Sequence, residues 1–381
     1  MRTSLALAAL VSAVLIAACS SSGSNTGNQG SSSGGSGSSS SGGGGSSNGS
    51  SGGGSGGGSG SSSGGVLPPL DAAAPDGDVS MNDSGNGTQS YTVQFGPITV
   101  NSGEENTQCI VVNLHNPAPI HVGQIHDLLG TASHHMILYK LAAGTAEQPT
   151  PFNCQPFQSA LNPATGNPLI ISQKPDDTLT LPQNVAFTLD ANQIVRLEMH
   201  YINANPNTSV TLVTTSTLTT IPDSDYKYDA SFLFIGDPQI NIPAMSTWST
   251  GVQYFQMPSN YNSSNFWAIT GHEHHLGTKV QIWSAQSSSD PGTLIYTSTS
   301  WSDPPVTPFS PPIHIPAGGG YKFQCDYDNT TTSSVSFGES ANDEMCFFWA
   351  YYWPSQGAQV CFVSSTISAC CPGSSPLCSA F

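Results

Sequence analysis

The sequence predicts an all-β protein with a sandwich or jelly-roll architecture, and three observations support this prediction. No stretch past Ser90 shows a sustained helical period of apolar residues. Short alternating runs recur instead, for example at 91–95 and 280–283, and Pro, Gly, Asn and Asp residues bound them. The chain from Ser90 to Phe381 is long enough for one large or two medium domains with real cores, and we favour two.

The first eighteen residues, 1–18, are predicted to be a lipoprotein signal peptide. Arg2 precedes an apolar run at 5–18 that is too short to span a bilayer. The run ends in Leu-Ile-Ala-Ala followed by Cys19, which resembles the lipobox of bacterial lipoproteins. This resemblance implies lipidation of Cys19 and contact with the membrane only through that anchor. Alternatively, Cys19 is simply a small residue near a cleavage site.

The expected location is that of an exported bacterial lipoprotein. Ser20 is compatible with sorting to the outer membrane, facing either the periplasm or the cell surface. Residues 19–89 are predicted to be the lipidated Cys and a disordered linker. Ser and Gly with a few Asn make up almost all of residues 20–65, so this stretch should behave as a flexible coil. Residues 66–89 add Pro and Asp without periodicity and are expected to continue the disorder.

A break near residues 221–225 divides the folded part of the chain. This polar, turn-rich segment separates two β-rich blocks of similar size. We therefore predict an N-terminal domain at 90–224 and a C-terminal domain at 225–360, with a Cys-rich tail at 361–381.

The charge balance argues against nucleic acid as a partner. Asp and Glu outnumber Lys and Arg by 24 to 7, which gives a formal net charge of -17. Such a surface repels phosphate backbones and anionic lipids, so nucleic-acid binding is not expected. Acidic composition alone selects no partner.

The cysteines predict disulfide bonds. Nine cysteines less Cys19 leave eight, and an even number in an exported protein is typical of a disulfide framework. Four of them crowd into the tail, where sequence alone leaves three possible pairings: Cys361, Cys370, Cys371 and Cys378.

One strand-like segment directs a histidine out of the core. Along residues 194–201, Val195, Leu197, Met199 and Tyr201 alternate on one face. Side chains on a strand alternate between faces, so Arg196, Glu198 and His200 are expected to point the other way.

A second segment, residues 267–276, carries a His-x-His pattern. On a strand its two-residue period places His272 and His274 on one face, with Glu273 and His275 on the opposite face. Such a pair can offer two ring nitrogens to one metal ion, although an isolated pair can be incidental.

Two further candidates are weaker when taken alone. Adjacent strand residues face opposite sides, so His134 and His135 can share an ion only at a twist or through different ring nitrogens. Met345 and Cys346 must likewise face opposite ways, which leaves Met345 to face a cleft while Cys346 forms a disulfide. A lone methionine is more often a core filler.

Together these segments resemble the copper type II, ascorbate-dependent monooxygenases, the family of peptidylglycine hydroxylase and dopamine hydroxylase. The resemblance covers the chain from about Ser90 to Trp353. Four motifs match in order: His134-His135-Met136-Ile137-Leu138-Tyr139, Leu197-Glu198-Met199-His200-Tyr201, His272-Glu273-His274-His275-Leu276-Gly277, and Asp343-Glu344-Met345-Cys346 followed by Tyr351-Tyr352.

The resemblance implies two copper ions per chain, in two tandem antiparallel jelly-roll domains with a solvent-filled cleft between the metals. His134, His135 and His200 would hold the electron-supplying copper, whereas His272, His274 and Met345 would hold the oxygen-binding, catalytic copper. Independently, imidazole suits both copper oxidation states and a thioether favours Cu(I). The family's disulfides map onto Cys109–Cys154 and Cys325–Cys346, and other histidines, among them His275, are taken as surface or supporting residues.

The implied reaction is hydroxylation of a substrate C–H bond with O2 and ascorbate or another one-electron donor. The residues that hold a peptide carboxylate in the peptide-amidating members are replaced here by Thr270, Phe347 and Trp349. This departure predicts a small apolar or aromatic substrate and poor turnover of glycine-extended peptides. Glu198 replaces a Gln of those members and is expected either to tune the metal or to lie solvated on an exposed face.

Two other functions stay open at this point. A non-catalytic copper-binding or copper-scavenging surface lipoprotein would keep the same ligands without a productive substrate pocket. A surface adhesin on a Ser/Gly stalk would explain the anchor, the linker and the acidity, but not four ordered motifs.

Overall fold

Strands make up nearly all of the regular structure, which confirms the all-β prediction. The computed structural model describes residues 77–371, apart from 86, 156–165, 339, 341 and 366–367. The predicted signal peptide, Cys19, the linker up to residue 76 and Cys378 lie outside the described residues. Among those described, the one helical element is a 3-10 turn at Ser259–Tyr261, and no helix is long and apolar enough to cross a membrane.

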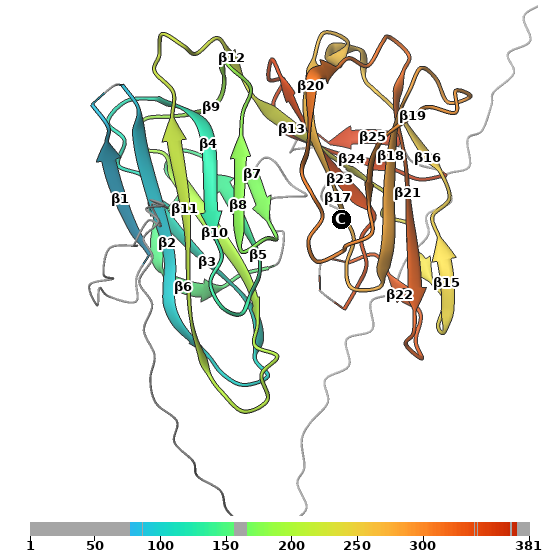
Figure 1. The fold of residues 1–381 in the computed structure, drawn as a ribbon, viewed down its shortest axis with the longest axis horizontal. Helices are drawn as coiled ribbons and strands as arrows, with labels where there is room; N and C mark the ends of the chain where they lie inside the picture. The colour runs from blue at the N-terminus through green and yellow to red at the C-terminus, as the bar shows by residue number, and fades with distance from the viewer. Residues whose placement is uncertain are drawn as a thin grey trace, which may run out of the picture. The chain divides into compact units, whose positions relative to one another are not determined.

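The first β-sandwich has two sheets, drawn in blue to green in Figure 1. The seven-stranded sheet runs in the order β1 (Asp78–Asp83), β2 (Gln89–Val100), β11 (Val210–Thr220), β4 (Ile120–Leu128), β9 (Val185–Leu189) and β12 (Tyr228–Asp229), with β8 (Asp176–Thr180) paired to β4. The five-stranded sheet runs β6 (Gln148–Asn153), β3 (Glu105–Asn113), β10 (Ile194–Ile202), β5 (Ser133–Lys140) and β7 (Asn167–Ser172).

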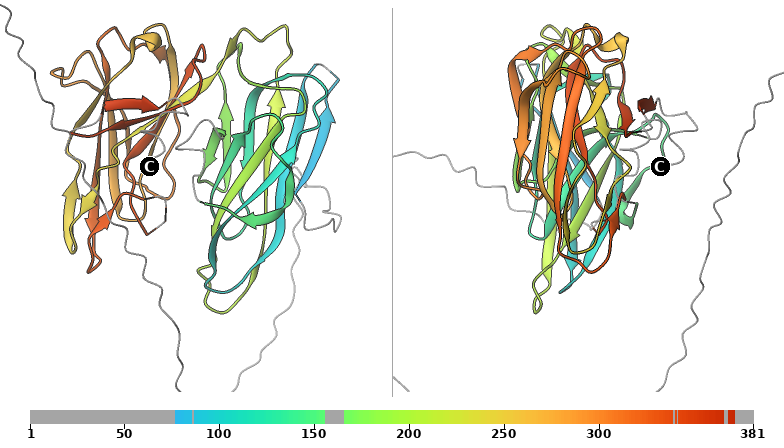
Figure 2. Two further views of the ribbon diagram at one scale, coloured as in Figure 1. Left: turned by 180° about the vertical axis from the view of Figure 1, so that it is seen from behind. Right: turned by 90° about the vertical axis from the view of Figure 1, so that its right-hand side faces the viewer.

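The second sandwich, drawn in yellow to red, follows the same principle, and Figure 2 shows its layers from two further sides. Its six-stranded sheet runs β20 (Thr307–Ile313), β17 (Asn265–His272), β23 (Phe347–Trp353), β13 (Ser231–Gly236), β24 (Gln359–Val363) and β25 (Ser368–Cys371). The facing sheet runs β15 (Ser246–Ser249), β21 (Gly320–Asn329), β18 (Gly277–Ala285) and β19 (Thr293–Ser298), with β16 (Gln253–Gln256) paired to β21. A small ladder joins β14 (Asn241–Ile242) to β22 (Val335–Ser336).

Two hydrophobic clusters fill the described part of the chain. Alternation on β2 buries Tyr91, Val93 and Phe95 in the first cluster, as expected for a sheet with one face on a core. That cluster continues onto one face of β23 and β13, where Phe347 and Phe234 stack with ring centroids 4.5 Å apart. The second cluster lies inside the second sandwich.

The strands correct the predicted extent of the linker. Asp78–Asp83 pairs antiparallel with β2, so the expectation of disorder up to residue 89 is wrong for this segment. Short alternating polar strands carry little hydrophobic signal, and backbone pairing with β2 decides the outcome here.

Three disulfides join described residues. Cys109 joins Cys154, and Cys325 joins Cys346, which are the pairings that the family resemblance implies. In the tail, Cys361 of β24 joins Cys370 of β25, so one of the three pairings left open is selected.

Candidate metal centre

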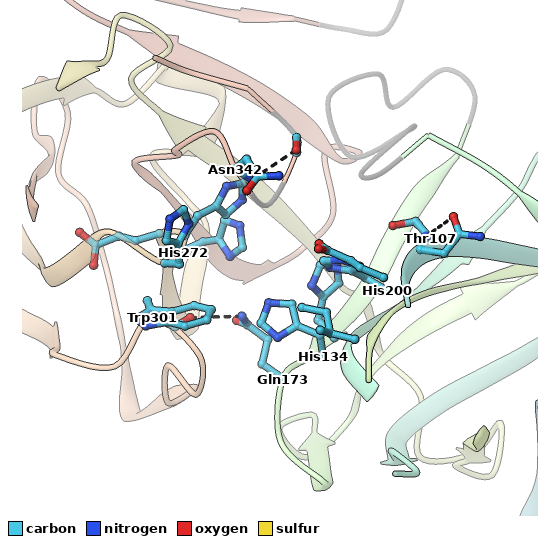
Figure 3. A pocket seen from close by; sticks show the side chains of 15 residues that line it. Thr107, His134, Gln173, His200, His272, Trp301 and Asn342 are labelled. Carbon is cyan, nitrogen blue, oxygen red and sulfur yellow. Dashed lines mark hydrogen bonds and ion pairs between the residues drawn. The ribbon is translucent and has the colours of Figure 1, made fainter. Parts of the chain in front are cut away.

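Six histidines line one cavity of about 450 Å³. All described residues belong to one compact unit, and the cavity walls come from both sandwiches. Figure 3 shows His134 and His200 on one side and His272 on the other. The lining residues are Glu105, Asn106, Thr107, His134, His135, Gln173, His200, Ile202, His272, Glu273, His274, His275, Trp301, Ser340 and Asn342.

The first histidine cluster comprises His134, His135 and His200. One ring nitrogen from each lies within 4.8 Å of the others, and the ring centroids are 4.9 to 5.3 Å apart. The register explains how two adjacent histidines both reach this point. His200 pairs with His135 and Tyr201 pairs with Ser133, so His134 is the extra residue of a β-bulge.

The environment of the first histidine cluster favours the uncharged form of its imidazoles. Burial, and to a lesser extent the neighbouring His200, lower the pKa of His134 to about 4. Burial also holds the pKa of His135 well below its usual value and lowers that of His200. Neutral imidazoles are the form that binds metal ions, so three of them gathered in one place fit copper in either oxidation state.

Glu105 was not predicted from the sequence. Its Oε1 lies 3.0 Å from Nε2 of His200, and its side chain lines the cavity while remaining 44% exposed. Glu105 pairs with Ile202 across the β3–β10 ladder, two residues beyond the histidine. Only that antiparallel register could have identified the contact.

The second cluster contains His272 and His274, whose ring centroids are 5.1 Å apart. The expectation that both lie on a strand is wrong, because β17 ends at His272 and His274 lies in the turn before β18. The expectation that Glu273 and His275 lie on the opposite face is also wrong, since both line the same cavity.

His274 is held by its backbone and by its ring. Its Nδ1 is 2.9 Å from the backbone carbonyl oxygen of Asp343, so a metal would be bound through Nε2. Burial lowers the pKa of His274 to about 4 and holds that of His272 well below its usual value. The buried carboxylate of Glu344 accepts hydrogen bonds from the backbone N–H groups of His274 (2.9 Å) and Leu276 (2.7 Å).

Met345 is fully buried and does not line the cavity, so the expectation that it faces a cleft is not met. Met345 belongs to the first hydrophobic cluster whereas Cys346 belongs to the second, so the two side chains do diverge as expected. Met345 directly follows the segment that contacts His274, and Tyr327 donates a 2.7 Å hydrogen bond to its carbonyl. The backbone therefore sets the place of Met345 beside His272 and His274. Its role as a ligand stays a prediction.

The three positions expected to shape the substrate pocket lie in the core. Thr270, Phe347 and Trp349 are buried, and none of them lines the cavity. The aromatic residue in the wall is instead Trp301, whose ring lies 5.5 Å from that of His134. Gln173 donates a 3.4 Å hydrogen bond to the carbonyl of Trp301, and this contact joins the two sandwiches (Figure 3).

Glu198 is fully buried, so of the two alternatives that of a solvated carboxylate on an exposed face is wrong. Its Oε2 accepts a hydrogen bond from the hydroxyl of Tyr139 at 3.1 Å and lies 3.3 Å from a guanidinium nitrogen of Arg196. The Arg196 guanidinium also lies 4.0 Å from the centre of the Tyr139 ring. Tyr139 and Arg196 therefore compensate the buried negative charge of Glu198.

Comparison with known proteins finds a family similar to part of the second half of the chain. Residues 228–370 match the family described as copper type II ascorbate-dependent monooxygenase, C-terminal domain. No curated protein matches the chain.

Two solved capsid proteins are among the structural matches. The STIV MCP shares 9% identity, with 73% of this chain and 97% of that chain covered and a TM-score of 0.27. The major capsid protein P2 from bacteriophage PM2 shares 9% identity, with 70% and 99% covered and a TM-score of 0.31. Scores this low support no conclusion about fold or function.

Proposed function

We propose, on the premise that residues 228–370 are a copper type II ascorbate-dependent monooxygenase C-terminal domain, that the protein hydroxylates a C–H bond of a small substrate. The observation that carries the proposal is the single cavity lined by two separate histidine clusters, one from each sandwich. Two metal-binding groups that face one cavity suit a reaction in which one supplies electrons and the other binds oxygen and substrate.

The side chains that would hold copper are His134, His135 and His200 on one wall, and His272 and His274 on the other together with Met345, which is buried outside the cavity lining. Copper in these places would supply one-electron transfer and the activation of O2. The overall balance is R–H, O2, two electrons and two protons giving R–OH and water. Two molecules of ascorbate or another one-electron donor supply the electrons.

The chain's own residues contribute position and environment. Backbone bonds from His274 and Leu276 to Glu344 fix the turn that presents His274. The low pKa values of the histidines keep them neutral at pH 7 and able to bind metal. Trp301 and Gln173 connect the walls and limit the space beside His134.

The cavity wall supports part of the substrate hypothesis. Among the described residues that line the cavity, none is a lysine or arginine that could pair with a peptide carboxylate. The apolar side chains in the wall are those of Trp301 and Ile202. We therefore retain an uncharged small molecule with an apolar or aromatic part as the expected substrate, and glycine-extended peptides as poor ones.

The discriminating experiment is ascorbate-dependent oxygen consumption by the copper-loaded protein. We expect uptake by the wild type that is lost in His272→Ala and kept in His314→Ala, a histidine outside the cavity lining. Copper binding without oxygen uptake, with any donor and a broad panel of small molecules, would favour the copper-binding lipoprotein instead.

A further inference from the structure

The two histidine clusters differ in the group that forms a hydrogen bond with a ring nitrogen. At the first cluster, Nε2 of His200 lies 3.0 Å from the carboxylate of Glu105. At the second, Nδ1 of His274 lies 2.9 Å from the neutral carbonyl oxygen of Asp343. The buried carboxylate of Glu344 accepts hydrogen bonds of 2.9 and 2.7 Å from the backbone N–H groups of His274 and Leu276, and its Oε1 lies 4.0 Å from Nδ1 of His275. A carboxylate at hydrogen-bond distance from a ring nitrogen is therefore found at His200.

The contact selects which nitrogen of His200 can bind a metal. A carboxylate accepts hydrogen bonds, so Nε2 of His200 carries the proton and donates it to Glu105. The lone pair then lies on Nδ1, on the other side of the ring. A carboxylate that holds the outer N–H of a ligating histidine fixes its tautomer and orientation and raises its basicity.

The charge of Glu105 also acts on the oxidation state of a bound ion. Within the described part of the wall, no lysine or arginine offsets the carboxylate. A nearby negative charge and a more basic imidazole both stabilise Cu(II) more than Cu(I). At the second cluster, Nδ1 of His274 faces the neutral carbonyl oxygen of Asp343, and the proposed ligand set adds a thioether that favours Cu(I).

We propose that Glu105 is a positioning residue that lowers the reduction potential of copper bound at His134, His135 and His200. Glu105 would thereby favour the transfer of one electron from Cu(I) at the first site, which would become Cu(II), to the second site. The one-electron donor of the proposed reaction then restores Cu(I). This inference rests on the proposed function.

The test is a potentiometric titration of the full-length, copper-loaded protein, monitored by the Cu(II) electron paramagnetic resonance signal. Glu105→Gln keeps the volume and one acceptor oxygen but removes the charge. We expect the ratio of Cu(II) to Cu(I) affinity at the first site to fall about tenfold, equivalent to a rise of about 59 mV in that midpoint. The second midpoint should stay unchanged. His272→Ala, which leaves the first cluster intact, assigns the two midpoints.

The matched control is Glu104→Gln, which makes the same charge change at the neighbouring residue. Glu104 accepts hydrogen bonds from Asn101 and does not line the cavity. A first-site midpoint that rises no more in Glu105→Gln than in Glu104→Gln overturns the proposal. Should Glu105→Gln release the first-site copper, retention with a wild-type midpoint in Glu105→Asp supports it, and loss in both variants overturns it.

Failure of the proposed function gives a different result. The titration needs neither substrate nor turnover, so an unchanged midpoint in a protein that still consumes oxygen refutes only the role of Glu105. A wild type with two copper ions and the expected midpoint shift, but no oxygen uptake, refutes only the monooxygenase reaction.

Discussion

Replacing Tyr327 by phenylalanine removes one hydroxyl group that holds the segment carrying Met345. Tyr327 lies on β21 and is 2% exposed, and its hydroxyl donates a 2.7 Å hydrogen bond to the carbonyl of Met345. The same segment is fixed by the disulfide from Cys325 to Cys346. The tyrosine therefore acts on the backbone of Met345 without belonging to the cavity wall.

The expected magnitude follows from burial. A neutral hydrogen bond contributes about 1 kcal/mol net, and a buried carbonyl left without a donor costs about 1–3 kcal/mol. We expect Tyr327→Phe to lower the free energy of unfolding by about 2 kcal/mol, which corresponds to a fall in Tm of about 4–8 °C. Copper affinity at the second site should fall about tenfold, because Met345 can shift relative to His272 and His274.

The assay is urea unfolding with an unchanged m-value, combined with a Cu(I) competition titration. The matched control is Tyr254→Phe. The Tyr254 hydroxyl donates a 2.9 Å hydrogen bond to the carbonyl of Gly318 at an exposed site of the same sandwich. That variant should lose less than about 0.5 kcal/mol and bind copper normally. Equal stability and equal copper affinity in the two variants would show that the Tyr327 bond does not position the Met345 segment.

Three further outcomes are expected. As pH falls from about 6.5 towards 4, the copper-free wild type should lose stability relative to a His134→Gln variant, because the unfolded chain protonates His134 before the folded protein, in which its pKa is about 4; the buried carboxyls are common to both proteins, and a stability difference that stays constant or moves the other way contradicts this. The double variant Cys325→Ser/Cys346→Ser, which opens a disulfide with a sequence separation of 21, should lose about 3 kcal/mol and weaken the second copper site, whereas Cys109→Ser/Cys154→Ser should spare that site, as copper titration would show. Cu(II) loading should quench indole fluorescence less in Trp301→Phe than in the wild type, while Trp248→Phe, outside the cavity wall, should leave the quenching unchanged.

The histidine pattern was readable from the sequence because ligand type and short spacing are local properties. His272 and His274 do lie close together, although a strand end and a turn, not strand alternation, place them. For His134 and His135 the sequence could only require some irregularity. The β-bulge that provides it depends on the register with β10, which is a tertiary property.

The residues that sequence reasoning missed come from contacts between distant segments. Glu105 reaches His200 across a ladder, and Trp301 reaches His134 from a loop of the other sandwich. Conversely, Phe347 and Trp349 were expected in the substrate pocket from their place near Met345, but packing turns both into the core. Local sequence identifies ligand chemistry well, whereas the walls of a cavity between domains depend on how the domains pack.

The most direct test of the two-copper account is the copper content per chain after reconstitution and removal of loosely bound metal. We expect two copper ions in the wild type, one in His272→Ala and one in His200→Ala. The copper kept by His272→Ala should have only nitrogen or oxygen ligands in X-ray absorption, whereas the copper kept by His200→Ala should also have a sulfur ligand. A single copper in the wild type, or loss of both ions in either variant while the fold is retained, would contradict two separate copper centres.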